Sequence, residues 1–467
     1  MAPETTVRNF DLNIEKILEG WETCHALREI IANALDEQVL SNTKDVVIAE
    51  NHGSWHIRDF GRGLKYEHLT QKENPEKLRK SSVVIGKFGV GLKDALATLN
   101  RRGIDVRICS KFGEITLGKL AKHDFSDVKT LHAIVHRPEN QAFVGTEVKV
   151  RGVTKKDVTT AKNFFLKFSD ETVLDETPYG QILLRDSDRK ARIYVTGMLV
   201  AEEEDFVFSY NITSLTATMR KALNRERTNV GRTAYSERVK RMLLASEADT
   251  VADTLAADLE KMEAGTNHDE VNWTDVAVHA CQILNASKKV IFVTASELLQ
   301  HKSVIDLAKS DGLKVITVPN KLRDALGGLC DLQGNPVRDL SVYESEWEQS
   351  FEFKFVKPEQ LTKQEMNVFR QRHAIAKLIG GMPKRVNKIK ISETMRPDFH
   401  TGHVTQGLWD PVTGSIIVLR TQLKSSDRFA GTFLHEIAHA KTGFDDVTRE
   451  FEGELTQMLG RVAAFRL

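Results

Sequence analysis

Glycine-containing motifs stand at three points of the first 150 residues. They constrain the fold because each motif lies where a strand or helix pattern begins or ends. The groups are Asp59-Phe-Gly61-Arg-Gly63, Gly86-Lys87-Phe-Gly89-Val-Gly91 and Gly145-Thr146. Glycine lets a backbone approach a ligand closely, and glycines that lead into a helix N-terminus form an anion cradle. No β-α-β start precedes the second group, so a Rossmann dinucleotide motif does not fit.

A polar constellation lies in the helical pattern of residues 14–40. The stretch Arg28-Glu29-Ile-Ile-Ala-Asn33-Ala-Leu-Asp36 places Glu29, Asn33 and Asp36 at spacings of four and three, hence on one helical face. A carboxylate, an amide and a second carboxylate in register can hold a divalent cation and a water. An ordinary solvated face of an amphipathic helix gives the same pattern, so the glycine groups decide in favour of a ligand site.

In this order the four motifs resemble the GHKL ATPases, the family of gyrase B subunits, heat-shock chaperones, sensor histidine kinases and MutL proteins. The resemblance covers about residues 20–150. It implies a Bergerat-fold α/β sandwich that binds ATP and Mg²⁺. Sensor kinases have Asn in place of a base such as Glu29 and need a phosphoacceptor helix upstream, so an ATPase is favoured over a kinase.

By position, the resemblance assigns a role to each residue of these motifs. Glu29 would be the general base that activates water against the γ-phosphate, Asn33 would hold Mg²⁺, and Asp59 would accept the adenine amino group. Asp36 is interpreted as structural. The remaining contacts fall to Thr146 beside Asp59, to Gly61 and Gly63 against the base, and to Gly86, Gly89 and Gly91, which would close over the phosphates as a lid. Lys87 is a candidate phosphate contact, and a solvated lysine accounts for its position at least as well.

The chain divides into four blocks, which we interpret as domains: 1–154, 155–265, 266–344 and 345–467. In the first we expect strands at 46–49, 55–58 and 146–150. In the second we expect strands at 181–184, 192–200 and 206–210 and one long helix at 236–262. The third holds a β-α-β unit at 290–319, which implies a small parallel sheet. The last combines a helix at 363–379, strands at 388–391 and 415–420, a turn at 409–414 and two closing helices.

The second block resembles the transducer domain that follows the ATPase in gyrase-like and MutL-like proteins. Such domains insert a basic side chain into the nucleotide site. The candidate loop is Leu223-Asn224-Arg225-Glu226-Arg227-Thr228, since a guanidinium can bind developing phosphate charge in a bidentate manner. Arg225 and Arg227 remain equal alternatives, and a basic surface turn accounts for the loop equally well.

The C-terminal block carries a metal-ligand motif on an apolar helix. In His435-Glu436-Ile-Ala-His439 two imidazoles share a face and can chelate Zn²⁺, and Glu436 can act as a base on a zinc-bound water. A buried helix whose histidines are hydrogen-bonded within the protein and bind no metal would have the same sequence pattern. Here the intervening positions are apolar, and the strand 415–420 precedes the helix as an edge strand does in zincin metallopeptidases.

A third zinc ligand is needed, and the helix of residues 447–464 offers one. Glu452 and Glu454 flank its apolar stripe about equally by angle, and Glu452 is preferred because its neighbours on that flank look less exposed. The region resembles the gluzincins, whose third ligand is a glutamate on the following helix. It departs from the metzincins, because Gly443 and Asp446 fall one residue too late for that motif.

Together these patterns predict an α+β multidomain protein in which a GHKL ATPase and a transducer-like domain are fused to a zincin-like domain. In this family ATP binding closes a lid and usually drives dimerisation. We therefore expect a nucleotide-dependent homodimer whose nucleotide state regulates a zinc peptidase acting on a protein or peptide. The alternative is an ATP-dependent clamp or chaperone, including a nucleic-acid-associated one, with a structural zinc site and no proteolysis.

Charge and hydropathy bear on partners and location. The chain has 66 Lys and Arg against 65 Asp and Glu, a net charge of +1, so no global field recruits nucleic acid or an anionic membrane. The N-terminus lacks a signal-peptide pattern, and the longest apolar runs are too short to cross a bilayer. We expect a cytoplasmic protein without a membrane partner.

Overall fold

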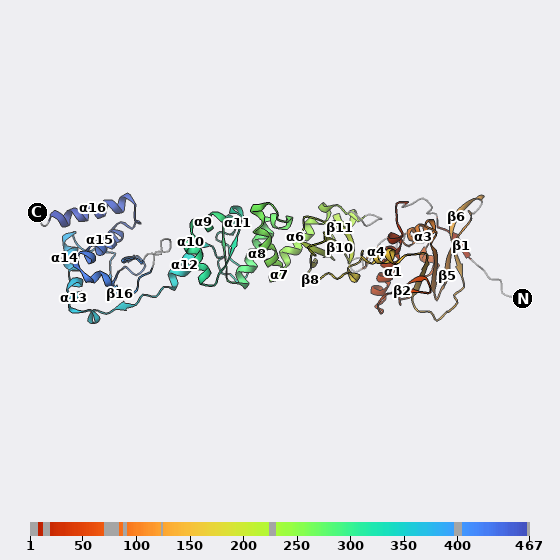
Figure 1. The fold of residues 1–467 in the computed structure, drawn as a ribbon, viewed down its shortest axis with the longest axis horizontal. Helices are drawn as coiled ribbons and strands as arrows, with labels where there is room; N and C mark the ends of the chain where they lie inside the picture. Colours follow the sequence, from red (N-terminus) through yellow and green to blue (C-terminus); the bar gives the residue numbers. More distant parts are fainter. Residues whose placement is uncertain are drawn as a thin grey trace. The chain divides into compact units, whose positions relative to one another are not determined.

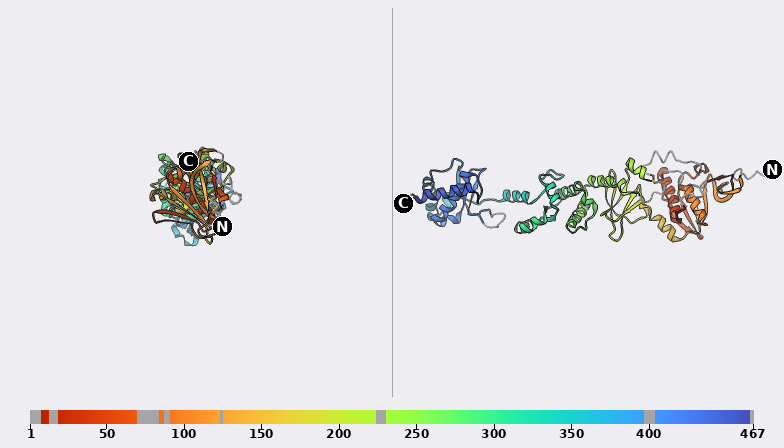
Figure 2. Two further views of the ribbon diagram at one scale, coloured as in Figure 1. Left: turned by 90° about the vertical axis from the view of Figure 1, so that its right-hand side faces the viewer. Right: turned by 90° about the horizontal axis from the view of Figure 1, so that it is seen from above.

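The structure is a computed structural model that describes residues 8–12, 19–69, 84–86, 91–122, 125–223, 230–396 and 404–464. These residues form a mixed α/β fold with four sheets, divided into two compact units, 1–284 and 285–467. Each sheet lies inside one of the four blocks expected from the sequence. Figures 1 and 2 colour the chain from red at the N-terminus to blue at the C-terminus.

The first unit begins with a seven-stranded antiparallel sheet of strand order β1-β6-β5-β4-β7-β3-β2. Its strands are β1 (Arg8–Asp11), β2 (Val47–Asn51), β3 (Ser54–Arg58), β4 (Asp105–Ser110), β5 (Gly113–Lys122), β6 (Phe125–His136) and β7 (Thr146–Arg151). In β4, Val106 and Ile108 are buried, as alternation in a strand with one core-facing side requires. The three strands expected here are confirmed to within two residues.

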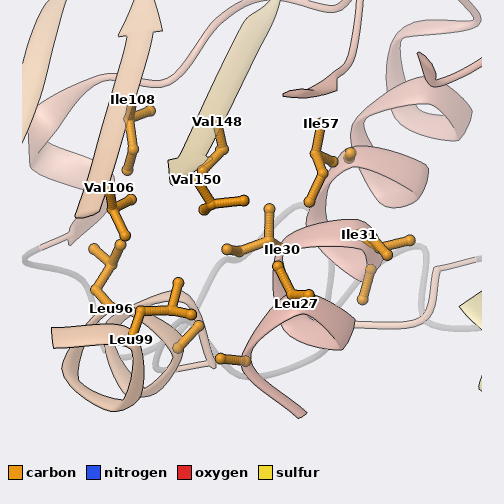
Figure 3. Packing of buried hydrophobic residues seen from close by; sticks show 14 of the residues in the cluster. Leu27, Ile30, Ile31, Ile57, Leu96, Leu99, Val106, Ile108, Val148 and Val150 are labelled. Carbon is orange, nitrogen blue, oxygen red and sulfur yellow. The ribbon is translucent and has the colours of Figure 1, made fainter. Parts of the chain in front are cut away.

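Two helices, α1 (Thr23–Ser41) and α3 (Gly91–Arg101), cover one face of this sheet. Figure 3 shows Ile30 of α1 directed toward Val148 and Val150 of β7. These side chains belong to one cluster of buried hydrophobic residues. Burial of apolar area drives the packing of helix on sheet, and it fixes the polar face of α1 relative to the end of β3 and the start of α3.

A five-stranded sheet of order β11-β10-β12-β9-β8 follows in the same unit. Its strands are β8 (Val173–Thr177), β9 (Gly180–Leu184), β10 (Ala191–Val195), β11 (Met198–Glu203) and β12 (Phe208–Ile212). The helices of this region are α4 (Lys155–Lys162), α5 (Ala217–Ala222), α6 (Ser236–Ala245), α7 (Asp249–Leu259) and α8 (Thr274–Ser287).

Two elements expected in this block are each split in two. The strand at 192–200 is a hairpin, because Thr196 and Gly197 have positive φ angles of 48° and 81° and reverse the chain. The helix at 236–262 breaks at the buried Ser246, whose hydroxyl donates to Asp175 Oδ2 at 2.6 Å. Serine favours such ends over helix interiors because its side chain competes for hydrogen bonds.

Glu270 carries a fully buried carboxylate beside the five-stranded sheet. Its oxygens accept hydrogen bonds from the N–H groups of Val207 at 2.9 Å and Phe208 at 3.3 Å and from the Tyr210 hydroxyl at 2.9 Å. Burial outweighs these donors and raises the pKa of Glu270 from its ordinary 4.5 to about 7. The native chain therefore retains a proton here that the unfolded chain has already released.

The free energy of unfolding is expected to fall as pH rises from about 4.5 to about 7, by roughly 3 kcal/mol at most from this group. Below that window both states are protonated, and above it both are ionised. Glu270→Gln keeps a carbonyl acceptor but does not titrate, so the difference between wild type and variant isolates the effect. Urea unfolding followed by tryptophan fluorescence at several pH values measures it, and identical pH slopes for the two proteins would contradict it.

The second unit opens with a confirmed β-α-β element. Strands β13 (Val290–Val293) and β14 (Lys314–Thr317) pair in parallel, and helices α9 (Ala295–Gln300) and α10 (Lys302–Ser310) connect them in place of the single helix expected. Helices α11 (Asn320–Leu326) and α12 (Leu340–Ser350) follow.

The C-terminal part is a four-stranded sheet of order β15-β16-β18-β17 with four helices. The elements are β15 (Phe355–Val356), α13 (Lys363–Arg370), α14 (Arg372–Leu378), β16 (Lys388–Ser392), β17 (Gly407–Asp410), β18 (Ser415–Leu419), α15 (Ser426–Thr442) and α16 (Arg449–Ala464). The two closing helices are confirmed.

The strand before α15 was expected to be an edge strand, and this expectation is wrong. β18 pairs with both β16 and β17, so it is internal, and β17 forms the edge. Part of the expected turn at 409–414 is strand, because Trp409 and Asp410 pair with Ile416 and Ser415. Across the part of the chain that the structure describes, every helix is too short or too polar to span a bilayer.

Candidate functional site

Glu29 lies buried on α1, where the adjacent Arg28 holds it. The Nη2 and Nε atoms of Arg28 lie 3.0 and 3.2 Å from Glu29 Oε1, and both side chains are almost fully buried. The guanidinium also lies over the rings of Trp21 and Phe164, 5.3 and 5.4 Å from their centroids. A Cβ on Gly91, the first residue of α3, would lie 2.4 Å from Glu29 Oε2. A larger residue at position 91 would therefore displace the Glu29 carboxylate.

Asn33 and Asp36 follow on the same face of α1. Asn33 Nδ2 donates to the main-chain oxygen of Glu29 at 2.9 Å, and the amide oxygen is the atom of this side chain that binds cations. The Asp36 carboxylate accepts the N–H groups of Ile85 at 2.6 Å and Gly86 at 2.8 Å. These two bonds tie residues 85–86 to α1, which is a structural role.

Asp59 joins the end of β3 to the start of β7. Its N–H donates to Thr146 O at 3.0 Å, and its Oδ1 accepts the N–H groups of Gly61 at 2.9 Å and Thr146 at 3.2 Å. Burial raises the pKa of Asp59, and the two N–H donors oppose that rise. Gly145, which precedes Thr146 in the third glycine motif, has φ 82°, and a Cβ there would lie 2.0 Å from Asp59 O.

Gly61 and Gly63 pack closely against protein atoms. A Cβ on Gly61 would lie 2.4 Å from Glu37 Cγ, and one on Gly63, where φ is 89°, would lie 3.2 Å from Gly145 O. The Glu37 carboxylate accepts the Arg62 N–H at 2.8 Å and its Nε at 2.9 Å. Substitution of either glycine would therefore disturb the loop that carries Asp59.

The structure brings the predicted nucleotide residues together in three pairs: Glu29 with Gly91, Asp36 with Gly86, and Asp59 with Thr146. The predicted residues Lys87, Gly89, Arg225 and Arg227 lie outside the described residues. Arg28 is a further residue of this site that sequence reasoning passed over. Its position before Glu29 was visible, but the burial of both side chains was not.

His435 and His439 lie one turn apart on α15 and face the same point. Their Nε2 atoms are 3.3 Å apart, and Asp446 Oδ1 lies 3.1 Å from the first and 3.3 Å from the second. Among the described residues, these three form the group whose potential ligand atoms all lie within 4.8 Å of one another. Two imidazole nitrogens and a carboxylate oxygen are common zinc ligands.

Asp446 reaches the histidines because the chain reverses directly after α15. Gly443 ends the helix with φ 74°, and its N–H donates to His439 O at 2.8 Å, a left-handed cap that glycine favours. The main-chain oxygen of Phe444 then lies 2.8 Å from His439 Nδ1. A bond at Nδ1 orients the ring so that Nε2 faces the metal position.

The environment of the His435 imidazole favours its neutral form. The Phe451 ring of α16 packs against both, with centroid distances of 4.9 Å to His435 and 4.4 Å to His439. Burial lowers the pKa of His435; Asp446 opposes this effect, and His439 adds to it. Metal ions bind the neutral imidazole. The burial that lowers the pKa of His435 therefore also favours metal binding.

The predicted third ligand, Glu452, is not a member of this group. Its side chain is exposed on α16, and the runner-up, Glu454, pairs with Lys441 at 2.9 Å. Leu459, on the flank chosen for its burial, is itself 54% exposed. The sequence contains a signal for Asp446, because it follows Gly443 by three residues, as a metzincin ligand follows its glycine. Both residues lie one position later than in the metzincin motif, so Asp446 was not predicted as a ligand.

Glu436 is buried between α15 and the edge strand β17. Burial raises its pKa to about 8, Asp446 acts in the same direction, and the Trp409 N–H opposes the rise as a donor. A Cβ on Gly407 would lie 2.6 Å from Glu436 Oε1, so the backbone of β17 approaches this carboxyl group closely. Glu436, His435 and His439 all line a cavity of about 1220 Å³.

Comparisons with known proteins give relatives in one organism. A family model described as the Mycoplasma pneumoniae MPN635 N-terminal domain matches residues 156–249. An uncharacterized protein of Mycoplasma pneumoniae is 36% identical over 246 residues, which are 51% of this chain and 98% of that protein. A second uncharacterized protein of this organism is 25% identical over 331 residues, which are 67% of this chain and 93% of that protein. The chain therefore belongs to the same family as the first of these two Mycoplasma pneumoniae proteins.

Proposed function

We propose that the chain is an ATP-regulated zinc peptidase. In this proposal the seven-stranded sheet with α1 and α3 is a Bergerat-fold GHKL ATPase, the five-stranded sheet is transducer-like, and the C-terminal part is zincin-like. One observation carries it: His435, His439 and Asp446 lie within 4.8 Å of one another in a cavity that Glu436 also lines. This arrangement combines a metal-ligand set, a buried carboxyl group and room for a substrate.

The residues of this cavity fit a zinc peptidase. A zinc ion bound there would polarise the scissile carbonyl and lower the pKa of a water molecule. Glu436 takes the proton of the attacking water and passes it to the leaving amine. The Trp409 N–H and the bare backbone of Gly407 hold Glu436 in place. The exposed edge of β17 offers main-chain groups to an extended peptide.

The residues around Glu29 fit a nucleotide. Bound Mg²⁺ would neutralise charge on the phosphates. The amide oxygen of Asn33 would hold it, Glu29 would activate the attacking water, and Asp59 would accept the adenine amino group. Gly91 leaves space beside Glu29 at the N-terminus of α3, where helix N–H groups favour a phosphate.

Asp446→Ala is expected to weaken zinc binding by about 100-fold or more, whereas Glu452→Ala retains the metal. The reason is that Asp446 Oδ1 lies 3.1 and 3.3 Å from the Nε2 atoms of the two histidines, whereas the Glu452 side chain is exposed on α16. Elemental analysis after dialysis against a weak chelator measures zinc per chain, with His435→Ala as the zinc-free reference. Loss of zinc in Glu452→Ala together with full zinc in Asp446→Ala would reinstate the gluzincin-like ligand set.

A further inference from the structure

The cavity at the metal group follows the edge strand β17 along its length. Its lining includes residues 405–409 and then Pro411, Val412 and Gly414 in the turn before β18. An extended peptide can pair with an exposed strand edge through main-chain hydrogen bonds, while its side chains reach the surrounding walls. The charges along these walls therefore decide which peptides bind.

Arg385 lines the cavity at the C-terminal end of β17. The Asn387 N–H donates to Gly414 O at 2.7 Å, and a Cβ on Gly414 would lie 2.8 Å from Arg385 O. The Arg385 side chain extends toward the end of α15, where its Nη1 would lie 3.4 Å from a Cβ on Gly443. Because the Gly443 N–H bonds His439 O, the guanidinium approaches α15 one helical turn after the metal ligand His439, about 5 Å further along the helix axis.

Arg385 differs from Arg396, which lines the other end of the cavity. Arg396 forms an ion pair with Glu348 of α12 at 3.0 Å, and its main-chain oxygen accepts the Thr405 hydroxyl at 2.9 Å, just before β17. Within the ranges that the structure describes, no carboxylate pairs with Arg385. At one end of β17, Arg396 is thus paired with a carboxylate, whereas at the other end no described carboxylate pairs with Arg385. Five carboxyl groups also line the cavity: those of Glu344, Glu348, Glu436, Asp445 and Asp446.

We propose that Arg385 binds a carboxylate of the peptide substrate, so that the zinc site cleaves peptides with Asp or Glu on the N-terminal side of the scissile bond. This inference rests on the proposed peptidase function. A guanidinium binds a carboxylate in a bidentate, charge-assisted manner. Antiparallel pairing is the more stable arrangement, and it places the N-terminal part of the substrate beside the C-terminal end of β17, where Arg385 lies.

The offset of one turn along α15 sets the expected position of the acidic residue. A strand advances about 3.3 Å per residue, so one helical turn of about 5 Å corresponds to one or two residues of an extended peptide alongside. The acidic side chain is therefore expected at the first or second position before the cleaved bond. A free C-terminal carboxylate would need the opposite peptide direction.

The test uses the full chain loaded with zinc and a pool of short synthetic peptides in which Glu, Lys and neutral residues are equally frequent at every position. Mass spectrometry of the products gives the residue frequencies around each cleaved bond. Wild type is expected to prefer Glu over Lys at one of the two positions before the bond by about tenfold or more, as a charge-assisted hydrogen bond allows. Arg385→Glu reverses the preference toward Lys, and Arg385→Lys retains a weaker preference for Glu.

Arg370→Glu is the matched control, because it makes the same charge change at an exposed position of α13 outside the cavity. Its cleavage pattern is expected to equal that of wild type, and zinc content reports the integrity of each variant. Cleavage without an acidic preference, or a preference for Glu that persists in Arg385→Glu, overturns this inference alone. A zinc-loaded wild type that cleaves no peptide either with or without ATP overturns the proposed function and this inference with it.

Discussion

Glu436→Gln is expected to lower kcat/KM for peptide cleavage by roughly 10²–10⁴-fold, the usual contribution of a general base, with zinc content unchanged. Glutamine has the shape of the carboxyl group but cannot take the proton of the attacking water. The fold is expected to persist, because the amide is uncharged and occupies the same space beside Gly407. Loss of turnover would then report chemistry rather than unfolding.

A fluorogenic peptide gives kcat/KM, and elemental analysis gives zinc per chain. Glu450→Gln, the same change at an exposed position of α16, serves as the control and should behave as wild type. Undiminished cleavage in Glu436→Gln would remove the peptidase assignment. It would favour the alternative, an ATP-dependent clamp or chaperone with a structural zinc site.

Glu29→Gln is expected to lower the ATP hydrolysis rate by roughly 10²–10⁴-fold while nucleotide binding persists. Glutamine is the right substitution because its carbonyl oxygen can still accept the Arg28 hydrogen bonds. Alanine would leave a buried guanidinium without its carboxylate, which costs about 3–5 kcal/mol. Phosphate release measures hydrolysis, and a fluorescent ATP analogue measures binding.

Two further variants serve as controls for the effect of Glu29→Gln. Glu50→Gln, an exposed position of β2, should leave both quantities unchanged, whereas Asp59→Asn should lose nucleotide binding because Asp59 is the proposed adenine contact. With ATP held but not consumed, Glu29→Gln should show the peptide-cleavage rate that wild type shows with a non-hydrolysable analogue. Full ATPase activity in Glu29→Gln would refute the role of this residue as the base.

The α1 motif was predictable from sequence because helical spacing alone places Glu29, Asn33 and Asp36 on one face. Their partners were less accessible. The pairing of Asp36 with Gly86 joins residues 50 positions apart, which helical spacing cannot indicate. The ion pair of Arg28 with Glu29 escaped prediction, because a charged residue in a helix is ordinarily solvated and burial depends on rings supplied by distant segments.

The errors arose where local conformation overrode periodicity. The sequence from 192 to 200 is continuously strand-like, and Thr196 adopts a positive φ that threonine rarely takes, so the usual Asn-Gly or Asp-Gly hairpin signal was absent. The choice of Glu452 relied on helical angles, which describe positions along one helix. They contain no information on the turn at Gly443 that carries Asp446 back over α15.

The turn at Gly443 makes the metal group local in the sequence, since its three members lie between His435 and Asp446. Closing so short a loop costs little chain entropy. The proposed nucleotide site instead joins Asp59 to Thr146, 87 residues away, and the position of Glu436 beside β17 requires β17 to pair with β18. Local contacts form early and distant ones late. A nascent or partly unfolded chain is therefore expected to capture a metal ion before it can bind nucleotide or place the general base.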